Sequence, residues 1–418
     1  MNEATSRAPL WLTIALIAIS LAVLGLAVHR AAVTSFSHDE SFTYLHYPEA
    51  SFSDIVLHKH AYTNNHLLNT LGMKYAWQWF GDSELSLRLP NLAALALWLV
   101  YAIRILRPLW PPLAIGGLLL LCANPYLIEL FTLARGYGLS FGFFLMAQYH
   151  LARAITGPGM KHLGLFHIAS VLAALSNFTL LTAYVAGLCL YYVAPLFMGL
   201  GEGGRRSRRA YVQGFAMLVA AFLVLRKPVL QVMENNAFDF GGKGGLFADT
   251  VGTWARSFLP GIGVGTGLML AMQVLISAVV LIPAFVLVRH AILRNTAFLR
   301  KHSALLVLGT TLIATCIGAE LQHLLLGVDR MAGRFAMFLE PSLVLLLPLQ
   351  LSLLRGSPGK WFALCVLASC AAWCALRFPD HFGPDHSVEW AYDLRTIERA
   401  VTKVAPCVSA IHGCWSPP

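Results

Sequence analysis

The sequence predicts an all-α protein, a polytopic bundle of transmembrane helices, and two observations carry this prediction. Hydrophobic residues make up 57% of the 418 residues and charged residues only 12%, about half the charged share of a soluble domain. The apolar residues also fall in long runs, and a bilayer core takes about 20 residues of helix. So few charges cannot cover a water-facing surface of this size, which excludes a soluble enzyme, a disordered chain and a disulfide-stapled secreted domain.

Eleven apolar runs are candidate spans. The first run is too long for the apolar part of a signal peptide, and no clear small-x-small cleavage site follows it, so we expect an anchored helix. We therefore divide the chain into a membrane domain, residues 1–377, and a short tail, residues 378–418. The candidate spans are residues 10–29, 91–107, 111–130, 137–153, 162–180, 182–199, 210–226, 260–288, 303–326, 335–354 and 361–377.

The gaps between the runs alternate in charge, and this alternation predicts the orientation. Counted together with the adjoining span ends, one set of five gaps holds fourteen Lys and Arg residues and a single acid, Glu202, whereas the other set holds 17 of the 20 acids. The positive-inside rule places the basic set in the cytoplasm, so the N-terminus is cytoplasmic and the tail is outside. A net charge of +10 would also suit nucleic acid, but that needs a basic face on a soluble domain. We expect no nucleic-acid partner.

The long loops all lie on the outside face, at residues 30–90, 227–259 and 378–418. The cytoplasmic gaps are short, so we expect the chemistry outside. We interpret loop 227–259 as a cover over the active site, although a flexible linker explains its glycines equally well. Cys407 and Cys414 lie in the tail, and whether they form a disulfide stays open.

The first outside loop begins with two adjacent acids, Asp39 and Glu40, directly after the first span. A carboxylate at the membrane surface can act as a general base or as a metal ligand. The pattern is also typical of a helix start, with Asp39 as the N-cap and Glu40 in the first turn. Both interpretations stay open on these residues alone, and we take both acids as candidate catalytic residues.

A polar segment follows in the same loop, with three histidines and three asparagines among residues 58–69. We take Asn64, Asn65 and His66 as candidate substrate-binding residues. Imidazole and carboxylate groups together suit a divalent cation, although no fixed ligand spacing is present. Asp39 with His66 is therefore the candidate site for Mg²⁺ or Mn²⁺, and we expect no other cofactor.

Arginines stand at two further outside positions. Arg135 precedes a glycine at a span junction, where its guanidinium can offer a bidentate fork to phosphate oxygens. Arg330 and Arg334 flank Gly333 at another outside span end, and suit an anionic headgroup in the same way. Simple anchoring of these side chains among the lipid headgroups is the alternative.

The order of these features is more specific than any one of them. They are Asp39-Glu40, the stretch FGDSELSLRLP at residues 80–90, Asn124-Pro125, and the stretch LARGYGLS at residues 133–140. In this order the chain resembles the integral-membrane GT-C glycosyltransferases, in the branch of the protein O-mannosyltransferases and the lipid A aminoarabinose transferases. The similarity covers about residues 30–155, with a further segment from Arg330 to Pro341.

The resemblance implies a GT-C-like fold and roles for several residues. Asp39 resembles the family's first-loop catalytic aspartate, with Glu40 beside it. Arg135 and Tyr137 resemble the pair near the donor phosphate. Many members have an acid two residues before the arginine, where this chain has Leu133.

Two consequences follow from the departures from the family pattern. The change at residue 133 leaves Glu129 as the nearest acid, and we take it as a candidate substrate-binding residue. Asn64-Asn65-His66 also stands where many members have His-Pro-Pro or Lys-Pro-Pro.

The resemblance also implies partners and a location. The expected donor is a sugar on a polyprenyl phosphate, and the expected acceptor is a glycan, a glycolipid or a protein; membrane lipids are the remaining partners. The protein is expected in a bacterial inner membrane with its active site facing the periplasm. Many relatives carry a large C-terminal soluble domain, whereas about 40 residues remain here after the last span.

The chemistry of such a donor needs two things from the protein. Its leaving group is already a phosphate, so a base for the acceptor hydroxyl and positive charge for the phosphate suffice. We assign the base to Asp39 and the phosphate clamp to Arg135, completed by Arg330 and Arg334. Attack opposite the phosphate would invert the anomeric centre.

Two other classes of function stay open. A lipid or solute transporter would place polar residues near mid-membrane. The polar residues that best support transport lie near span ends instead. A non-catalytic partner in glycan assembly is the second alternative. The residues that favour transport are Glu320, Gln322, His323 and Glu340.

Overall fold

The computed structural model describes residues 9–57, 65–157, 160–197, 208–234, 241–259, 267–354 and 356–382. Within these ranges the chain is helical and has no β-strand, which confirms the predicted all-α class. The helices are α1 (Leu10–Val33), α2 (His38–His46), α3 (Phe52–Val56), α4 (Leu67–Phe80), α5 (Glu84–Leu106), α6 (Pro111–Cys122), α7 (Pro125–Phe131), α8 (Gly136–Thr156), α9 (Met160–Ser176), α10 (Leu180–Phe197), α11 (Arg208–Glu234), α12 (Gly252–Phe258), α13 (Gly267–Ile292), α14 (Thr296–Lys301), α15 (Ser303–Leu326), α16 (Glu340–Leu351) and α17 (Gly356–Phe382).

Each of the eleven predicted runs contains helix. Among the described residues, eight helical segments are long and apolar enough to cross a membrane, and the bent pair α6–α7 makes a ninth. The predicted runs 137–153 and 162–180 correspond to α8 and α9. α9 has 17 residues, and α8 is long enough but carries polar side chains in its second half, such as Gln148 and His150.

Two predicted spans are interrupted. The run 111–130 is a broken helix, with a bend of 66° between α6 and α7. Pro125 has no N–H for the preceding turn, and the side chain of Asn124 accepts from the N–H groups of Tyr126 and Leu127 and so begins a new helix. The run 335–354 starts as 3₁₀ turns and becomes α-helix only at Glu340.

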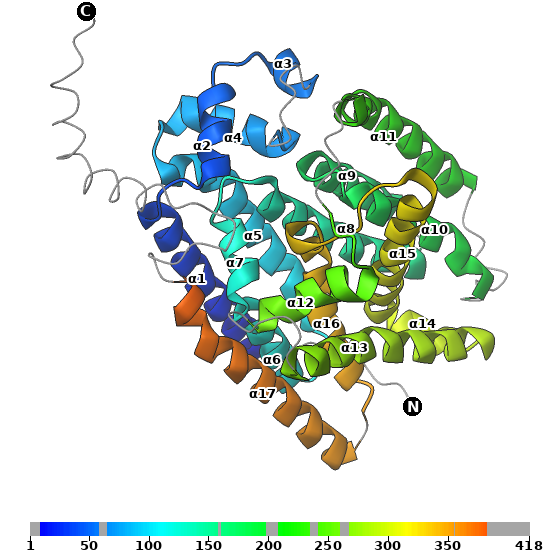
Figure 1. The fold of residues 1–418 in the computed structure, drawn as a ribbon. Helices are drawn as coiled ribbons and strands as arrows, with labels where there is room; N and C mark the ends of the chain where they lie inside the picture. Colours follow the sequence, from blue (N-terminus) through cyan, green and yellow to red (C-terminus); the bar gives the residue numbers. More distant parts are fainter. Residues whose placement is uncertain are drawn as a thin grey trace, which may run out of the picture.

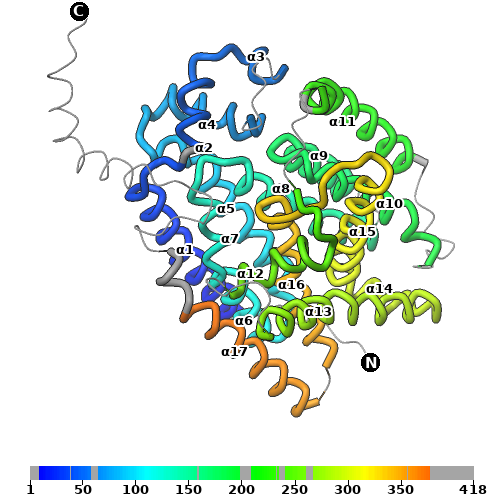
Figure 2. The backbone as a smooth tube through the Cα atoms, viewed as in Figure 1, coloured from blue at the N-terminus to red at the C-terminus, as the bar shows by residue number. Residues whose placement is uncertain are grey.

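Helices differ in how far the protein covers them. The membrane-length windows of α13 and α17 are only 17% buried, whereas the span that contains α16 is 72% buried. Large apolar side chains such as Phe285 on α13 are open at the surface, as expected for a helix that faces lipid. Figure 2 shows α17 along the edge of the bundle beside α6, and the two helices are in contact.

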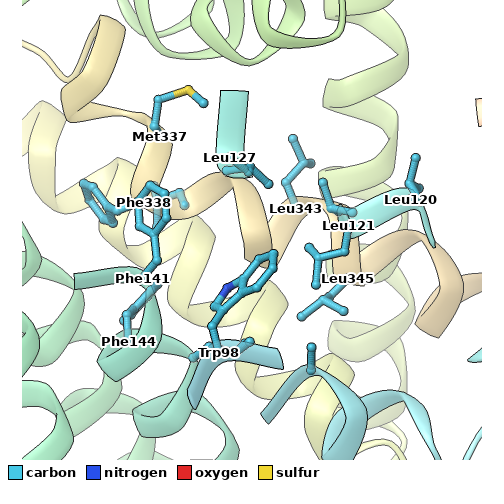
Figure 3. Close-up of a cluster of buried hydrophobic side chains, with 14 of the residues drawn as sticks. Trp98, Leu120, Leu121, Leu127, Phe141, Phe144, Met337, Phe338, Leu343 and Leu345 are labelled. Carbon is cyan, nitrogen blue, oxygen red and sulfur yellow. The ribbon is translucent and has the colours of Figure 1, made fainter. Parts of the chain in front are cut away.

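The core lies where α5, α6, α7, α8 and α16 meet (Figure 3). Trp98 of α5 is fully buried there, and Phe144 of α8 meets the ring of Phe338 edge to face. α5 and α8 approach closely because α8 has Gly142 at the contact, where a Cβ would lie only 2.8 Å from the Ala94 carbonyl oxygen. Small residues that let backbones approach are the usual device for packing helices in membranes.

The loop of residues 30–90 contains α2, α3 and α4, which Figure 1 shows grouped at one end of the bundle. The sequence predicts loop helices here, with an amphipathic one over residues 65–80, and α4 corresponds to that one. Trp79 and Phe80, at the end of α4, are 73% and 62% exposed, which suits aromatic side chains in a headgroup layer.

The described part of loop 227–259 is packed against the chain around residue 330. Residues 227–234 continue α11, and after residue 241 a π-helical turn, Phe247–Val251, leads into α12. Gly242 pairs with Arg330 in an isolated bridge, and buried Trp254 donates to the Ala336 carbonyl at 3.0 Å. Residues 235–240 and the tail beyond 382 lie outside the described residues.

Candidate functional site

A capping box begins α2 and sets the directions of its two acids. The Ser37 hydroxyl accepts from the Glu40 N–H, and a Glu40 carboxylate oxygen accepts from the Ser37 N–H at 2.8 Å. Both hydrogen bonds satisfy N–H groups that the first turn of a helix leaves unpaired. The expectation that Asp39 is the N-cap is therefore wrong, because Ser37 takes that position, whereas Glu40 lies in the first turn as expected. The Asp39 side chain makes other contacts.

Glu40 is fully buried in an ion pair with Arg88, and both side chains are 0% exposed. Arg88 donates from Nε to Glu40 Oε1 at 2.9 Å and from Nη2 to Oε2 at 3.0 Å. The Ala134 N–H also donates to Oε1, at 2.5 Å. The Glu40 carboxylate thus has partners from three segments, a pattern typical of a positioning residue.

Arg88 extends this network to the end of α1. Its Nη1 donates to the carbonyl of Ala31 at 2.9 Å, and its Nη2 to that of Ser35 at 2.9 Å. Burial by itself would raise the pKa of Glu40, but the charge and hydrogen bonds of Arg88 and the backbone donors outweigh burial and lower that pKa. The carboxylate is therefore ionised at neutral pH and ties α1, α2, α5 and the segment before Arg135 together.

Asp39 meets two arginines at one carboxylate oxygen. Its Oδ2 lies 2.8 Å from Nη1 of Arg135 and 2.9 Å from Nη1 of Arg334. The Asp39 side chain is 21% exposed and that of Arg334 25%, whereas that of Arg135 is only 4% exposed. The site is therefore open to solvent at the carboxylate and closed behind Arg135.

Each arginine is held where a segment begins. Arg135 is the N-cap residue of α8, and Arg334 lies in the 3₁₀ turn Gly333–Phe335 that leads into α16. Nη1 of Arg135 is buried and makes no well-aligned hydrogen bond, so its contact with Asp39 is an ion pair only. A buried guanidinium at this position is suited to an anionic group that enters the site.

Tyr137 and His66 form the wall beside Arg135. The Arg135 guanidinium lies 5.7 Å from the Tyr137 ring centroid, and the rings of His66 and Tyr137 meet edge to face at 5.3 Å. Gly136 permits this contact, because a Cβ there would collide with the Ser176 carbonyl oxygen and the His66 ring. Tyr137 is buried, with 1% exposed.

His66 is neutral at physiological pH. Burial, and then the positive charges of Arg135 and Arg334, lower its pKa to about 3, against the opposing effect of Asp39. Its Nδ1 lies 3.1 Å from the Ser176 carbonyl oxygen. Because a carbonyl only accepts, the neutral ring carries its proton on Nδ1, and Nε2 is an acceptor.

The other predicted site residues have partners of their own. Asn65 donates to the Ile55 carbonyl at 2.9 Å, and Glu129 is buried in an ion pair with Arg30 at 2.7 Å. Arg330 donates from Nε to both carboxylate oxygens of Glu320, at 2.9 Å each. Asn64 lies outside the described residues.

Three of the predicted phosphate-binding and catalytic residues therefore share one point, Asp39 with Arg135 and Arg334. Tyr137 and His66 adjoin that point, whereas Glu40 stands behind it. Asn65, Glu129 and Arg330 are engaged in other contacts, and their predicted roles stay predictions.

Sequence reasoning missed the residues that hold this site in shape. No role for Arg88 is evident from the sequence beyond its place in the stretch FGDSELSLRLP before the second span. Asn91 donates to Asn69 at 2.7 Å and accepts from the Leu139 N–H, and Asn69 donates to the Ala134 carbonyl at 2.8 Å. Arg88 and Asn91 stand in or next to the FGDSELSLRLP stretch, so the signal was present.

The residues present fit an anion better than a divalent cation. No group of three or more His, Cys, Asp or Glu side chains that could hold a metal occurs in the described ranges. Asp39 with His66 offers few ligands, whereas Mg²⁺ takes six, and two guanidinium groups already flank the carboxylate. A cation at Asp39 and His66 stays a prediction without a built ligand set.

The fold is similar to that of a known membrane protein. The crystal structure of ArnT from Cupriavidus metallidurans in the apo state matches with a TM-score of 0.50 and 14% sequence identity. The match covers 90% of this chain and 66% of the ArnT chain. No protein-family model matches the chain, and no curated protein matches its sequence.

This similarity concerns the fold. The chain has the polytopic helical architecture of ArnT, which confirms the expected GT-C-like fold of an integral membrane protein. It spans about two thirds of the length of that protein.

Proposed function

We propose that this protein is a membrane glycosyltransferase that moves a sugar from a polyprenyl-phosphate donor to a hydroxyl acceptor. The observation that carries the proposal is the contact of one Asp39 oxygen with Arg135 and Arg334. A carboxylate and two guanidinium groups at one point supply a base and a phosphate clamp together. The ArnT-like fold supports the same class of reaction.

The two arginines have different tasks in this mechanism. Arg135 is nearly closed off from solvent, so its charge acts where water screens it least. Arg334 lies in a short 3₁₀ turn and is a quarter exposed, so it meets the donor phosphate at the entrance. Both hold the phosphate while negative charge develops on it as the sugar leaves.

Asp39 accepts the proton of the acceptor hydroxyl. In the structure one oxygen of its carboxylate is occupied by two arginines. When the donor phosphate arrives, it competes for the same guanidinium groups, and the carboxylate oxygen becomes free to accept the proton as these contacts pass to the phosphate. The base is thus activated only when the donor is present.

The bonds balance in a single displacement. The acceptor oxygen forms a bond to the anomeric carbon, the bond from that carbon to the phosphate oxygen breaks, and the hydroxyl proton moves to Asp39. The polyprenyl phosphate leaves with the electron pair. Attack opposite the phosphate inverts the anomeric centre, and the neutral His66 ring beside the site offers an acceptor for a sugar hydroxyl.

Glu40 and Arg88 position this machinery. Their buried pair fixes the start of α2, and the Ala134 N–H bond fixes the residue before Arg135. Glu40 therefore acts through Asp39 and Arg135 and not on the substrate. We further propose that the site faces the periplasm of a bacterial inner membrane, with the N-terminus in the cytoplasm, as the charges of the gaps favour.

The test is transfer of label by the purified full chain from a panel of radiolabelled polyprenyl-phosphate sugars to membrane extracts. We expect transfer from at least one donor, and Asp39→Asn lowers the rate by about 10² to 10⁴-fold, the usual contribution of a general base. Asp82→Asn, an exposed acid in the same loop, is the matched control and keeps full activity.

Two outcomes would contradict parts of the proposal. If Asp39→Asn keeps full transfer, Asp39 is not the base. If the wild-type chain transfers label from none of the donors, the proposed activity is wrong. EDTA in the same assay tests the cation: loss of transfer that Mg²⁺ or Mn²⁺ restores would support a metal at Asp39 and His66.

A further inference from the structure

Two helices of the core connect the Asp39 site with the opposite end of the bundle. α5 begins beside Arg88 and ends near Arg104, and α8 begins at Arg135 and ends near Arg153. At a rise of 1.5 Å per residue, each pair of arginines is about 25 Å apart along its helix. Arg104 and Arg153 therefore lie at the far end of the hydrocarbon core from Asp39.

A cavity of about 660 Å³ opens at that far end. It lies among the ends of α5 and α8, the starts of α6, α15 and α17, and helix α14. Four of the five basic gaps of the sequence contribute to its lining, so these gaps meet at one end of the bundle. Among the described residues that line it there is no Asp or Glu, and its basic residues are Arg104, Arg153, Arg300, Lys301 and Lys360.

The cavity is charged at its mouth and apolar inside. All five basic side chains are exposed, whereas lining residues such as Leu113, Leu308 and Leu349 are buried. Gln148, which also lines the cavity, is buried and is bonded to Thr311 and Ser342. This arrangement matches a molecule with an anionic head and an apolar chain.

Aromatic rings hold two of the cations at the mouth. The Arg104 guanidinium lies 5.1 Å from the ring centroid of Tyr101 and 5.8 Å from that of Tyr149. The Lys360 ammonium lies 5.7 Å from the Trp110 ring. Cation–π contacts of this kind keep a charge in place without neutralising it, so these contacts leave the charges of Arg104 and Lys360 available to an anion.

We propose that this cavity, formed by the five basic residues named above and the buried leucines behind them, binds an anionic phospholipid of the adjacent leaflet. Basic pockets between transmembrane helices on the cytoplasmic side are suited to anionic headgroups. Like charges around one opening repel one another, and a phosphate at the mouth offsets that repulsion. The buried leucines receive an acyl chain, which a free phosphate lacks.

The test is native mass spectrometry of the full chain in detergent, with phosphatidylglycerol and phosphatidylcholine of identical acyl chains as probes. We expect one tightly bound phosphatidylglycerol and little phosphatidylcholine. The double variant Arg104→Gln/Arg300→Gln weakens the binding of phosphatidylglycerol about tenfold or more, since each basic residue near an anionic surface contributes to the attraction.

The matched control removes two charges from the same set of gaps but outside the cavity. Arg209 and Arg289 are exposed and do not line it, so Arg209→Gln/Arg289→Gln leaves phosphatidylglycerol binding unchanged. If both double variants weaken the binding of phosphatidylglycerol equally, the cavity residues do not bind the lipid specifically and the proposal is overturned. Gel filtration and thermal unfolding show whether either double variant is misfolded. If Arg104→Gln/Arg300→Gln is misfolded, Arg153→Gln/Lys360→Gln is tested in its place.

Two further arms decide the nature of the ligand. Equal binding of phosphatidylcholine would show that the headgroup charge is not recognised and would overturn the proposal. Inorganic phosphate that displaces the lipid at the lipid's own concentration would mean that the acyl chains add nothing, which would overturn a lipid site in favour of a free-anion site.

Discussion

The two ends of the helical bundle differ in the charged side chains that they bring together. At the end that carries α2, acids and arginines are matched: Glu40 with Arg88, Glu129 with Arg30, and Asp39 with Arg135 and Arg334. At the other end, five cations surround a cavity whose described lining contains no acid. Acids matched with arginines hold the first site in a fixed shape, whereas a cavity lined by cations and by no described acid suits a ligand of opposite sign.

The same comparison applies on a smaller scale to the neighbours Asp39 and Glu40. Glu40 is enclosed and has a partner at each oxygen, whereas Asp39 is partly open and shares one oxygen between two arginines. We therefore expect Glu40 to contribute to stability and Asp39 to chemistry, and variants at Glu40 and at the residues around Asp39 can break or sharpen that division.

The largest effect on stability is expected for Glu40→Gln. This change leaves Arg88 buried without its counter-charge, and removal of one partner of a buried pair costs about 3–5 kcal/mol. Thermal and denaturant unfolding of the detergent-solubilised chain, followed by circular dichroism, measures the loss. Glu49→Gln, an exposed acid of the same loop, is the control, and equal stability of the two variants would contradict the structural role of Glu40.

A smaller and purely functional effect is expected at the two arginines. Loss of one charge-assisted hydrogen bond to the donor phosphate lowers kcat/KM by about 10- to 100-fold, and we expect Arg135→Gln to lose more than Arg334→Gln because Arg135 is better shielded from water. Steady-state transfer assays with varied donor concentration check this order. Arg256→Gln, an exposed arginine of α12, is the control, and an unchanged kcat/KM in both site variants would remove the phosphate clamp.

The smallest effect is the dependence of stability on pH through His66. Its pKa is about 3 in the folded chain and about 6.5 in an unfolded one, so the unfolded state binds the proton first as the pH falls. Stability is therefore complete above pH 6.5 and decreases toward pH 3, by at most about 1.4 kcal/mol for each pH unit.

His66→Gln removes this contribution, so its unfolding free energy changes less between pH 6.5 and 5 than that of the wild-type chain. His46→Gln, an exposed histidine of α2, keeps the wild-type slope. Parallel curves for all three proteins would show that His66 is not buried as a neutral ring.

Much of the fold could be predicted because hydropathy and charge act locally. Runs of apolar residues predict helices that avoid exposing backbone groups to lipid, and each predicted run contains helix. The break at Asn124-Pro125 was also readable, since proline cannot continue the hydrogen bonds of the preceding turn. It was missed because the apolar run continues across it.

The partners of the charged residues could not be predicted in the same way. Arg334 lies 295 positions from Asp39 in the sequence, and no local pattern distinguishes it from Arg330, which pairs with Glu320 instead. Likewise no pattern in the sequence pairs Glu129 with Arg30, which it contacts in the structure. Such choices depend on which helix ends meet in space.

By itself, the sequence determined that this chain is an integral membrane protein with many apolar helices and that acids and arginines collect at span ends, because these properties follow from the solvent that each residue prefers. Only the tertiary structure decided which acid is enclosed, which two arginines meet Asp39, and that four distant basic gaps surround one cavity. Those outcomes arise from packing between helices far apart in the chain, where close contact and opposite charge select partners that chain order does not reveal.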